Sequence, residues 1–414
     1  MSAVIQLCIL LILNFIALRV FADADCNKTT TTKGFYDCTL QIDPSYQSSV
    51  LTKRSAQASR DAITKWPNPK LEAKSISGEN AGENVGSTEL SLSLSISDLL
   101  VKRPALSKSG RSEEKLKMVE GEESEFKSKT QLIKDLYRYR QIQDELELVN
   151  EAIAAFKKIE KQFRSRSARG PEQDITLSLV ELAQGDYQLQ KNHLAVELNE
   201  ILVKYKGILG SGFAFKDEWL PQLRQAWPNI NQSLISKYTF ELRKFEAEKE
   251  KREAEKNLAC AEAWPNIEAG PVIERSTEGP TQFTSTGFSL SVDVPVFNWN
   301  GGARALSRAN YEKAKLNYEY TLRKADLERD LLIQKFTSAV ESLKESTSSV
   351  ALKKKHDQID GLFRQGLTSS TTVIEAHRQI SEFTESRHEH ELVALESLMY
   401  IYQLSGLDPS EVLK

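Results

Sequence analysis

The chain has 414 residues, of which 27% are charged, 40% are hydrophobic and only 8% are aromatic. Its 55 basic and 58 acidic side chains give a formal net charge of −3, which excludes the strongly basic footprint of most nucleic-acid-binding proteins. A charged chain with few aromatic residues is typical of long solvated helices rather than of a large globular core.

Residues 1–24 have the pattern of a cleaved secretory signal. An apolar run from Val4 to Val20 is followed by Ala22-Asp23-Ala24, which supplies the small residues of a cleavage site. The segment lacks the usual Lys or Arg before the apolar run. A retained membrane anchor is the alternative, but the run is short for a span and polar residues interrupt it.

Residues 25–44 form an N-terminal segment that contains two of the four cysteines. Cys26 and Cys38 flank a short polar stretch and can pair in an oxidising compartment. A lipid on Cys26 is the alternative, although Asp23-Ala24-Asp25 does not resemble the small apolar tripeptide that lipoprotein processing requires. Cys260 stands alone on a predicted helix, where we expect it to be inert packing.

Two segments of the chain are copies of one plan. Trp66-Pro67-Asn68 stands 24 positions before an alternating run that starts at Leu90, and Trp264-Pro265-Asn266 stands 24 positions before one that starts at Phe288. An alternation of period two predicts a strand with one apolar and one polar face. Hydroxyls on one face and branched aliphatics on the other suit a barrel wall between lipid and water.

The first repeat spans residues 45–206. A helix over 45–65 precedes strands at 71–78 and 88–98, and two long helices follow at 122–169 and 175–206, separated by Gly170-Pro171. Residues 207–232 are a linker or equatorial segment. This segment holds a third Trp-Pro-Asn, at 227–229, which is either a coincidence or part of a small lateral subdomain.

The second repeat spans residues 233–407 and follows the same plan. A charged helix over 233–263 precedes strands at 269–276 and 283–296, and long helices follow at 303–360 and 371–404, before a C-terminal tail at 408–414. The fold class predicted is therefore mixed α and membrane β. Four strands cannot close a barrel, and an open edge is not tolerated in lipid, so several copies have to pool their strands.

The order and spacing of these features resemble the TolC family of outer-membrane efflux proteins. The stretch Val294 to Arg304 after the last strand carries the resemblance, together with the turn Phe363-Arg364-Gln365-Gly366-Leu367-Thr368 and the following Val373-Ile374-Glu375-Ala376. The resemblance covers about residues 45–407. It implies a homotrimer in which twelve strands form an outer-membrane β-barrel that continues as a periplasmic α-helical barrel.

The same resemblance implies a function and partners. A TolC-like protein is a passive channel-tunnel for efflux or type I secretion, lies in the outer membrane of a Gram-negative bacterium, and works with an inner-membrane transporter and a periplasmic adaptor. It contacts outer-membrane lipid, needs no cofactor, and is not an enzyme.

The resemblance also implies a pore gate at the second helical turn. Phe363 takes the position of the family's aromatic residue, Thr368 that of a basic residue, and Thr372 and Glu375 those of two acids. Three copies of Glu375 would form an acidic ring that favours cations. The alternative is that Glu375 is one more solvated helix glutamate.

The adaptor-docking tip is predicted at both helical turns, at Arg169 and Gly170 in the first and at Gly366 and Leu367 in the second. The arginines of the run 164–169 either pair with an acidic adaptor hairpin or are a solvated helix end, where cations are favoured.

The sequence supports two other classes of function less well. The chain contains no HExxH motif, P-loop or zinc-type cysteine pair, and the cluster from Arg387 to Glu391 is expected to be a solvated helix face rather than a metal site. The rival to a channel is a periplasmic coiled-coil scaffold or adhesin stalk, which has no need of two duplicated aliphatic strand faces.

Overall fold

The protein divides into two compact units that are both discontinuous in sequence. The computed structural model describes residues 26–80, 83–167, 170–224, 226–294, 299–347, 349–365 and 367–413. The helical unit comprises Met1–Ser48, Ser124–Lys237 and Leu327–Lys414, and the sheet unit comprises Ser49–Glu123 and Tyr238–Asp326. The predicted signal at 1–24, together with Arg169 and Gly366, lies outside the described residues.

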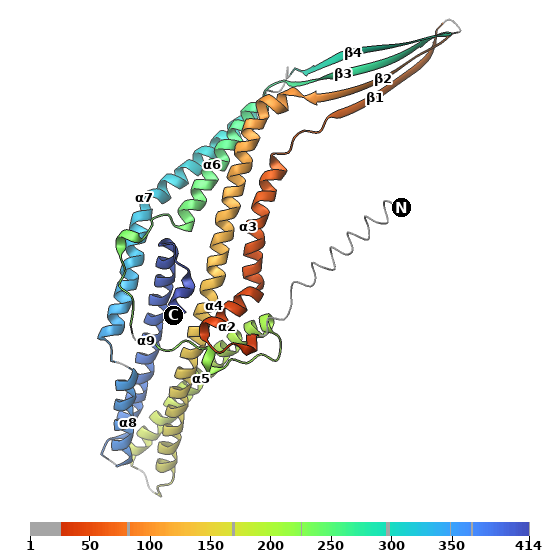
Figure 1. Ribbon diagram of the computed structural model, residues 1–414. Helices are drawn as coiled ribbons and strands as arrows, with labels where there is room; N and C mark the ends of the chain where they lie inside the picture. The colour runs from red at the N-terminus through yellow and green to blue at the C-terminus, as the bar shows by residue number, and fades with distance from the viewer. Residues whose placement is uncertain are drawn as a thin grey trace. The chain divides into compact units, whose positions relative to one another are not determined.

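Helices make up most of the described chain (Figure 1). In chain order they are α2 Thr32–Ile42, α3 Pro44–Ile63, α4 Arg103–Arg164, α5 Pro171–Leu209, α6 Phe240–Ala261, α7 Gly301–Glu345, α8 Ser349–Arg364 and α9 Ser370–Leu404. Short 3-10 turns occur at Cys26–Lys28, Asp217–Trp219, Gln232–Leu234 and Pro409–Leu413, and a π-helical turn occurs at Asp98–Lys102. None of the helices in the described ranges combines the length and the apolar character that crossing a bilayer requires.

The sheet unit contains one antiparallel sheet of four strands in the order β1-β2-β3-β4 (Figure 1). The strands are β1 Lys70–Asn80, β2 Glu83–Ser95, β3 Asn266–Glu278 and β4 Thr281–Asp293. Each half of the chain therefore contributes one hairpin, and the two hairpins join through β2 and β3. In that central pair the register passes from Ser91–Val272 to Leu94–Ala269.

The second strand ends earlier than predicted. Ile96 continues the apolar alternation, which led to an expected end at residue 98. Instead, the hydroxyls of Ser95 and Ser97 both donate to Asn266 Oδ1, at 3.1 and 2.8 Å, and the backbone turns into the helical segment that leads to α4. The other three strands extend past both predicted ends, except that β4 ends at Asp293 rather than at 296.

The first long helix begins at Arg103 rather than at residue 122. The predicted start followed from the absence of glycine and proline after residue 121, but Gly110 and Gly121 both lie inside α4. A Cβ atom at Gly110 would lie 2.8 Å from Thr64 Cγ2, and one at Gly121 would lie 2.4 Å from Lys53 Cγ. These glycines therefore serve close packing of α4 against α3 and the residues that follow it.

The predicted helix over 303–360 is two helices. α7 ends at Glu345 and α8 begins at Ser349. Arg387 of α9 donates to the carbonyl oxygen of Leu343 at 3.2 Å and also to the Ser346 hydroxyl, so a long-range partner satisfies the end of α7. The helix predicted from 233 likewise begins later, at Phe240, because the Thr239 side chain caps it.

An aromatic cluster forms the core of the helical unit. The Phe35 ring of α2 stacks on Trp219 with 4.5 Å between ring centroids, and Tyr205 and Phe213 lie beside it. The indole of Trp219 donates to the carbonyl of Thr29 at 2.9 Å. The segment predicted to be a linker is therefore part of the core.

Two further features anchor polar segments to this core. Cys26 and Cys38 form a disulfide, so the Cys26 sulfur is not available for a lipid. Trp227 of the third Trp-Pro-Asn packs edge-on against Phe336 with 6.1 Å between centroids. The third motif is thus a packing element in the helical unit.

In the sheet unit, ion pairs join α4 to α6. Lys115 pairs with Glu250 at 2.9 Å, and Lys251 pairs with Glu113 at 2.6 Å. Each pair is partly exposed and contributes little alone. This row of ion pairs explains why α6 is heavily charged and still packs along one side of α4.

Gly270 in β3 allows the close approach of β2 and β3 to be tested. A Cβ at Gly270 would lie 1.8 Å from the Leu92 carbonyl oxygen, whereas one at Gly287 would meet Val272 Cγ1 at an ordinary 3.4 Å. We expect Gly270→Ala to lower the free energy of unfolding by about 2 kcal/mol or more, since it forces β2 and β3 apart. Gly287→Ala is the matched control. The measurement is thermal unfolding followed by circular dichroism, and equal midpoints for both variants would contradict the close approach.

Candidate functional site

One face of the sheet is apolar across all four strands in the half nearest the helices, whereas the distal half of the same face carries polar residues such as Arg275 and Thr284. Directly opposed residues of antiparallel strands project to the same face, so Leu71, Leu92 and their neighbours form continuous rows. The apolar face consists of Leu71, Ala73, Leu90, Leu92, Leu94, Ile267, Ala269, Pro271, Ile273, Phe288, Leu290 and Val292. Most of its large side chains, such as Phe288, are exposed in the single chain. An uncovered apolar face of this extent marks an interaction surface.

The opposite face of the sheet is mainly polar, although Ile76, Val272 and Phe283 also lie on it. It carries the serines of both alternating runs and several carboxylates, namely Glu72, Glu89, Ser91, Ser93, Glu268, Glu274, Ser289 and Ser291. Ser93 donates to Glu268 at 3.2 Å across the central strand pair. The two faces of the sheet therefore differ as lipid-facing and water-facing surfaces do.

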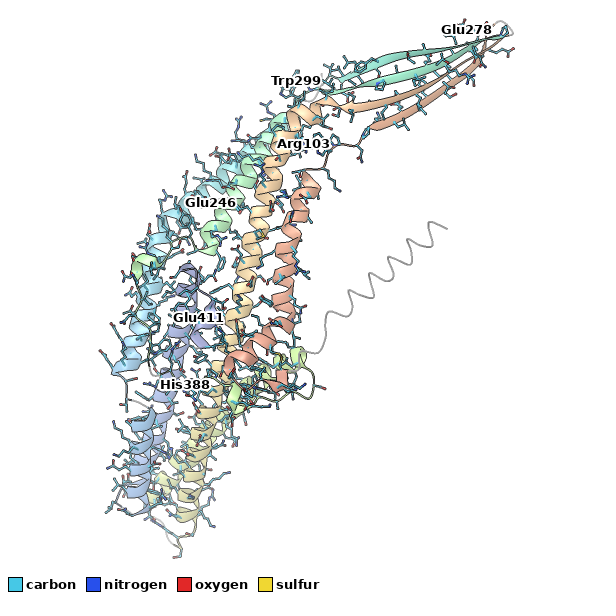
Figure 2. All side chains as sticks on the ribbon, viewed as in Figure 1. Arg103, Glu246, Glu278, Trp299, His388 and Glu411 are labelled. Atoms are coloured by element: carbon cyan, nitrogen blue, oxygen red, sulfur yellow. A yellow bond between two sulfur atoms is a disulfide. The ribbon has the colours of Figure 1, made fainter. Side chains whose placement is uncertain are left out.

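Three exposed tryptophans mark the end of the sheet that joins the helices. Trp66 precedes β1, Trp264 precedes β3, and Trp299 follows β4; their exposed fractions are 67%, 61% and 63%. Figure 2 shows Trp299 where the strands give way to helices. Tryptophan is enriched at the boundary between lipid and water, because one part of the ring is apolar and the N–H is polar.

α5 has apolar side chains on two opposite sides. Val180, Tyr187 and Leu194 are buried, whereas Leu182 and Leu189 are exposed, as are Ile175, Val196 and Val203. The exposed set recurs every seven residues and defines what we call the α5 stripe. A helix with two apolar sides requires a neighbour on each. Among the described residues of the helical unit, the first side is buried and the α5 stripe is exposed.

The first helical turn joins α4 to α5. Gly170 caps α5, with Pro171 at its first position, and the space around the Gly170 Cα is open. Arg164 pairs with Glu160 at 2.7 Å and with Glu181 at 2.5 Å. This arginine is therefore already engaged within the turn.

The second helical turn joins α8 to α9. Ser369 caps α9 by accepting from the Thr372 N–H at 3.2 Å, and its hydroxyl lies 2.9 Å from that of Thr372. Leu367 is 71% exposed, and Thr368 is half-buried beside it. Phe363 is partly buried, because it packs against the apolar cluster that includes Phe156 and Val373.

Glu375 lies one turn into α9 and is exposed. The Arg378 guanidinium donates to its carboxylate at 2.7 Å, as does the Gln379 amide at 2.7 Å, and these bonds lower the pKa of Glu375 below its ordinary value. Arg378 also pairs with Glu382 at 2.5 Å. Sequence reasoning singled out Glu375 and missed Arg378, although the spacing of three residues on a helix was the available signal.

No family model matches the sequence, and no curated protein matches it either. Solved structures do match. A membrane protein from Pseudomonas aeruginosa is 14% identical, with 93% of this chain and 94% of that chain covered at a TM-score of 0.65.

Two outer-membrane channels match equally broadly. The open state of MtrE from Neisseria gonorrhoeae is 13% identical, with 91% of this chain and 89% of that chain covered at a TM-score of 0.62. CmeC from Campylobacter jejuni is 14% identical, with 93% and 91% covered at a TM-score of 0.62. The chain has the TolC fold. The resemblance drawn from the repeat and the turns is thereby confirmed for the architecture.

This instance of the TolC fold contains a buried polar network in its helical unit. Arg140 of α4 pairs with Glu391 of α9, and Arg140 also donates to the carbonyl of Pro221 at 3.2 Å. The Gln141 amide donates to Glu391 at 2.8 Å and to the His388 carbonyl at 3.2 Å. Residues far apart in sequence thus fix α4 against α9.

The network corrects the interpretation of 387–391 as a solvated helix face. His388 is 5% exposed and Glu391 is 2% exposed, and His388 Nδ1 lies 2.7 Å from Glu145 Oε1 (His388 is labelled in Figure 2). For these two residues the interpretation was wrong, because the residues that bury them lie on α4, whereas Glu389 of the same segment is exposed. Within the described ranges there is no group of three or more His, Cys, Asp or Glu side chains suited to a metal ion.

A second buried pair of side chains was not predicted. His356 of α8 and His377 of α9 are both buried, with His356 Nε2 3.3 Å from His377 Nδ1. The Phe156 ring stands edge-on to His377 with 5.5 Å between centroids. The pair joins the two helices that carry the second turn.

The Arg140–Glu391 pair can be tested by mutation. We expect Glu391→Leu to lower the free energy of unfolding by about 3–5 kcal/mol, because it leaves the Arg140 charge buried without its partner. Arg140→Met combined with Glu391→Leu should recover most of that loss. The exposed Glu389→Leu is the matched control on the same helix. Urea unfolding gives the values, and additive losses in the double variant would show that the two side chains are not coupled.

Proposed function

We propose that three copies of this chain form a passive channel-tunnel through the outer membrane of a Gram-negative bacterium. The sheets line a pore through the membrane and the helices continue it as a tunnel in the periplasm. The channel serves efflux or type I secretion together with an inner-membrane transporter and a periplasmic adaptor. The observation that carries this proposal is the apolar face of a sheet whose outer strands are β1 and β4.

The sheet supports assembly into a closed barrel. Its outer strands present unpaired backbone groups, which are costly in lipid unless another strand pairs with them. Pairing β4 of one copy with β1 of the next removes both edges, and three copies of the four-stranded sheet supply twelve strands. The apolar face then meets lipid, and the serine and carboxylate face meets water.

The α5 stripe supports contact between copies in the tunnel. Its side chains face away from the helical unit's own core, as Leu182 and Leu189 do. A second copy of the chain can cover the α5 stripe, because its own helices offer apolar faces of the same length. A seven-residue repeat is the spacing at which helices pack side by side over several turns.

The second helical turn supports a gate. Phe363 packs the turn against the apolar cluster, Thr368 and Thr372 lie at and beside the Ser369 cap, and Glu375 carries the exposed charge. In a trimer three copies of Glu375 form an acidic ring, and Arg378 offsets part of its charge. Cations are favoured by such a ring to the extent that the carboxylates outweigh the guanidinium groups.

The tips of both turns support docking of an adaptor. The sequence predicts one tip at Arg169 and Gly170 and the other at Gly366 and Leu367. The exposed Leu367 offers an apolar contact, and the open space at Gly170 allows a partner's backbone to approach closely. A coiled-coil scaffold is the rival function, and it leaves the apolar sheet face without a role. A channel needs neither a cofactor nor catalytic groups.

Assembly through the α5 stripe is testable with one charge. We expect Leu189→Asp to shift most of the purified protein from trimer to smaller species, because it places a carboxylate in an apolar helix contact. Ala195→Asp adds the same charge on an exposed side of α5 that lies off the stripe, and should leave the trimer intact. Mass is measured by light scattering in detergent. A Leu189→Asp protein that stays trimeric would remove the stripe from the interface.

The gate is testable by conductance in planar bilayers. We expect Glu375→Gln to lower the permeability ratio of cations over anions and Arg378→Gln to raise it, each by about twofold or more, because the two charges oppose each other in the ring. Glu385→Gln, an exposed glutamate elsewhere on α9, is the control. A solvated helix face predicts no change in any of the three.

The same channels have an expected pH dependence. Arg378 holds the pKa of Glu375 below its ordinary value, so the carboxylate stays charged as the pH falls through the range where a free glutamate is protonated. In Arg378→Gln the pKa returns toward that ordinary value. Cation selectivity should therefore be lost at a higher pH in Arg378→Gln than in the unaltered protein.

A further inference from the structure

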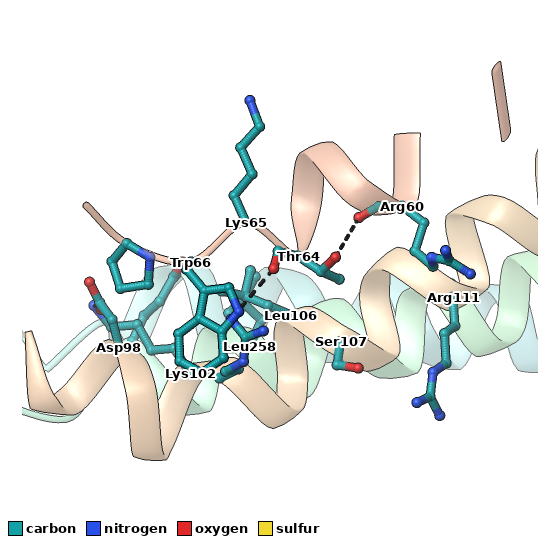
Figure 3. Close-up of a pocket in the computed structure, with 13 residues that line it drawn as sticks. Arg60, Thr64, Lys65, Trp66, Asp98, Lys102, Leu106, Ser107, Arg111 and Leu258 are labelled. Carbon is teal, nitrogen blue, oxygen red and sulfur yellow. Dashed lines mark hydrogen bonds and ion pairs between the residues drawn. The ribbon is translucent and has the colours of Figure 1, made fainter. Parts of the chain in front are cut away.

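A cavity of about 500 Å³ lies in the sheet unit where the strands meet the helices (Figure 3). The end of α3, the residues before β1, the turn Asp98–Lys102, the start of α4 and the end of α6 surround it. It therefore lies at the same end of the sheet as the exposed tryptophans. Neither the proposed pore nor the docking tips use it.

The cavity has an excess of positive charge. Five basic side chains line it against two acidic ones, Asp98 and Glu262. Lys102 is neutralised by Asp98 at 2.6 Å, and Arg60 by Glu114 at 3.1 Å. The other three basic residues are Lys65, Arg103 and Arg111, and none of them has a carboxylate partner among the described residues. An anion is the ligand that this set of charges would attract.

The cavity also has an apolar side. The Arg103 guanidinium lies 3.7 Å from the centre of the Trp66 ring, which leaves the ring edge exposed, and it donates to the Thr64 carbonyl at 3.5 Å. Leu106 and Leu258 are half-buried in the lining. Figure 3 shows Trp66 beside Lys102 and Asp98, whereas Lys65 and Arg111 extend away from Trp66 in different directions. The lining thus combines an aromatic platform, aliphatic surface and unpaired cations.

We infer that this cavity binds the phosphate headgroup of an anionic glycerophospholipid from the inner leaflet of the outer membrane. The inference rests on the proposed function, since the sheet has to span that membrane. A lipid fits the observations because the cations and Trp66 lie at the level where the apolar face of the sheet ends, which is the level of headgroups. Basic pockets at membrane surfaces bind anionic headgroups in this way.

A soluble anion fits the cavity less well. Free phosphate would engage cations of the lining but would leave Trp66, Leu106 and Leu258 uncovered. The glycerol and first acyl carbons of a phospholipid cover that apolar surface and reach the apolar face of the sheet beyond it. The lipid therefore satisfies both sides of the lining with one molecule.

The test is lipid binding by the full-length protein in detergent, measured by native mass spectrometry. Dioleoyl phosphatidylglycerol and dioleoyl phosphatidylcholine are added separately at matched concentrations. We expect tighter binding of phosphatidylglycerol, and a loss of about tenfold or more of that affinity in Lys65→Gln/Arg103→Gln/Arg111→Gln, with phosphatidylcholine unchanged. Arg54→Gln/Arg308→Gln/Lys313→Gln removes three exposed cations of the same unit outside the lining, and should keep the preference.

Two further measurements separate lost charge from disturbed packing, and lipid binding from binding of a soluble anion. Lys65→Gln/Arg111→Gln leaves Arg103 on Trp66, so an intermediate loss separates lost charge from disturbed packing. Excess glycerol 3-phosphate should not displace phosphatidylglycerol; equal competition would assign the cavity to a soluble anion. An unchanged lipid preference in the triple variant, or an equal loss in the control, would overturn the inference.

Failure of the proposed function would be recognised separately. A protein that neither enters lipid vesicles nor conducts in bilayers refutes the channel. A protein that conducts normally but does not prefer phosphatidylglycerol refutes only the lipid site.

Discussion

A single chain in water can neither cover the apolar face of this antiparallel sheet nor supply hydrogen-bond partners to the backbone groups of its two outer strands. Phe288 and Leu290 would face solvent, and the unpaired backbone groups of β1 and β4 would remain open to any other strand. On the proposed function, lipid covers the face and neighbouring copies cover the edges. The tryptophans beside the strand ends and the second apolar side of α5 then have the same origin, because each is a surface that assembly completes.

The helical unit depends on contacts within the chain, which hold its long helices at a fixed position along one another's axes. An apolar cluster around Phe156 joins the helices near the turns, but apolar contacts between helices tolerate sliding. The buried pairing of Arg140 and Gln141 with Glu391 does not, because a shift along the axis would leave a charge without its partner. Polar contacts thus set the register of α4 and α9, and apolar contacts supply the area.

The sequence predicted those features that depend on local periodicity. The alternation from Leu90 and from Phe288 predicted strands, and the glycine and proline at 170–171 predicted the first turn. Features that depend on distant partners were missed. The burial of His388 requires Glu145, which lies 243 positions away, and the continuation of α4 through Gly121 requires α3 beside it. The end of α7 depends on Arg387 in the same way. At the candidate gate the motif located Glu375, but motif matching does not weigh neighbouring charges, so Arg378 was overlooked.

The α5 stripe carries one more implication. The exposed Asp186, His193 and Glu200 lie between successive apolar side chains from Leu182 to Val203, whereas the exposed Leu179 lies between Ile175 and Leu182. On the proposed function, most of this stripe would be exposed to water before assembly as separate small apolar patches rather than as one continuous apolar surface. Separate small apolar patches promote non-specific aggregation less than one continuous patch does. The stripe binds strongly only when a matching helix lies along its whole length. The length of the contact therefore distinguishes a correct partner from a chance encounter.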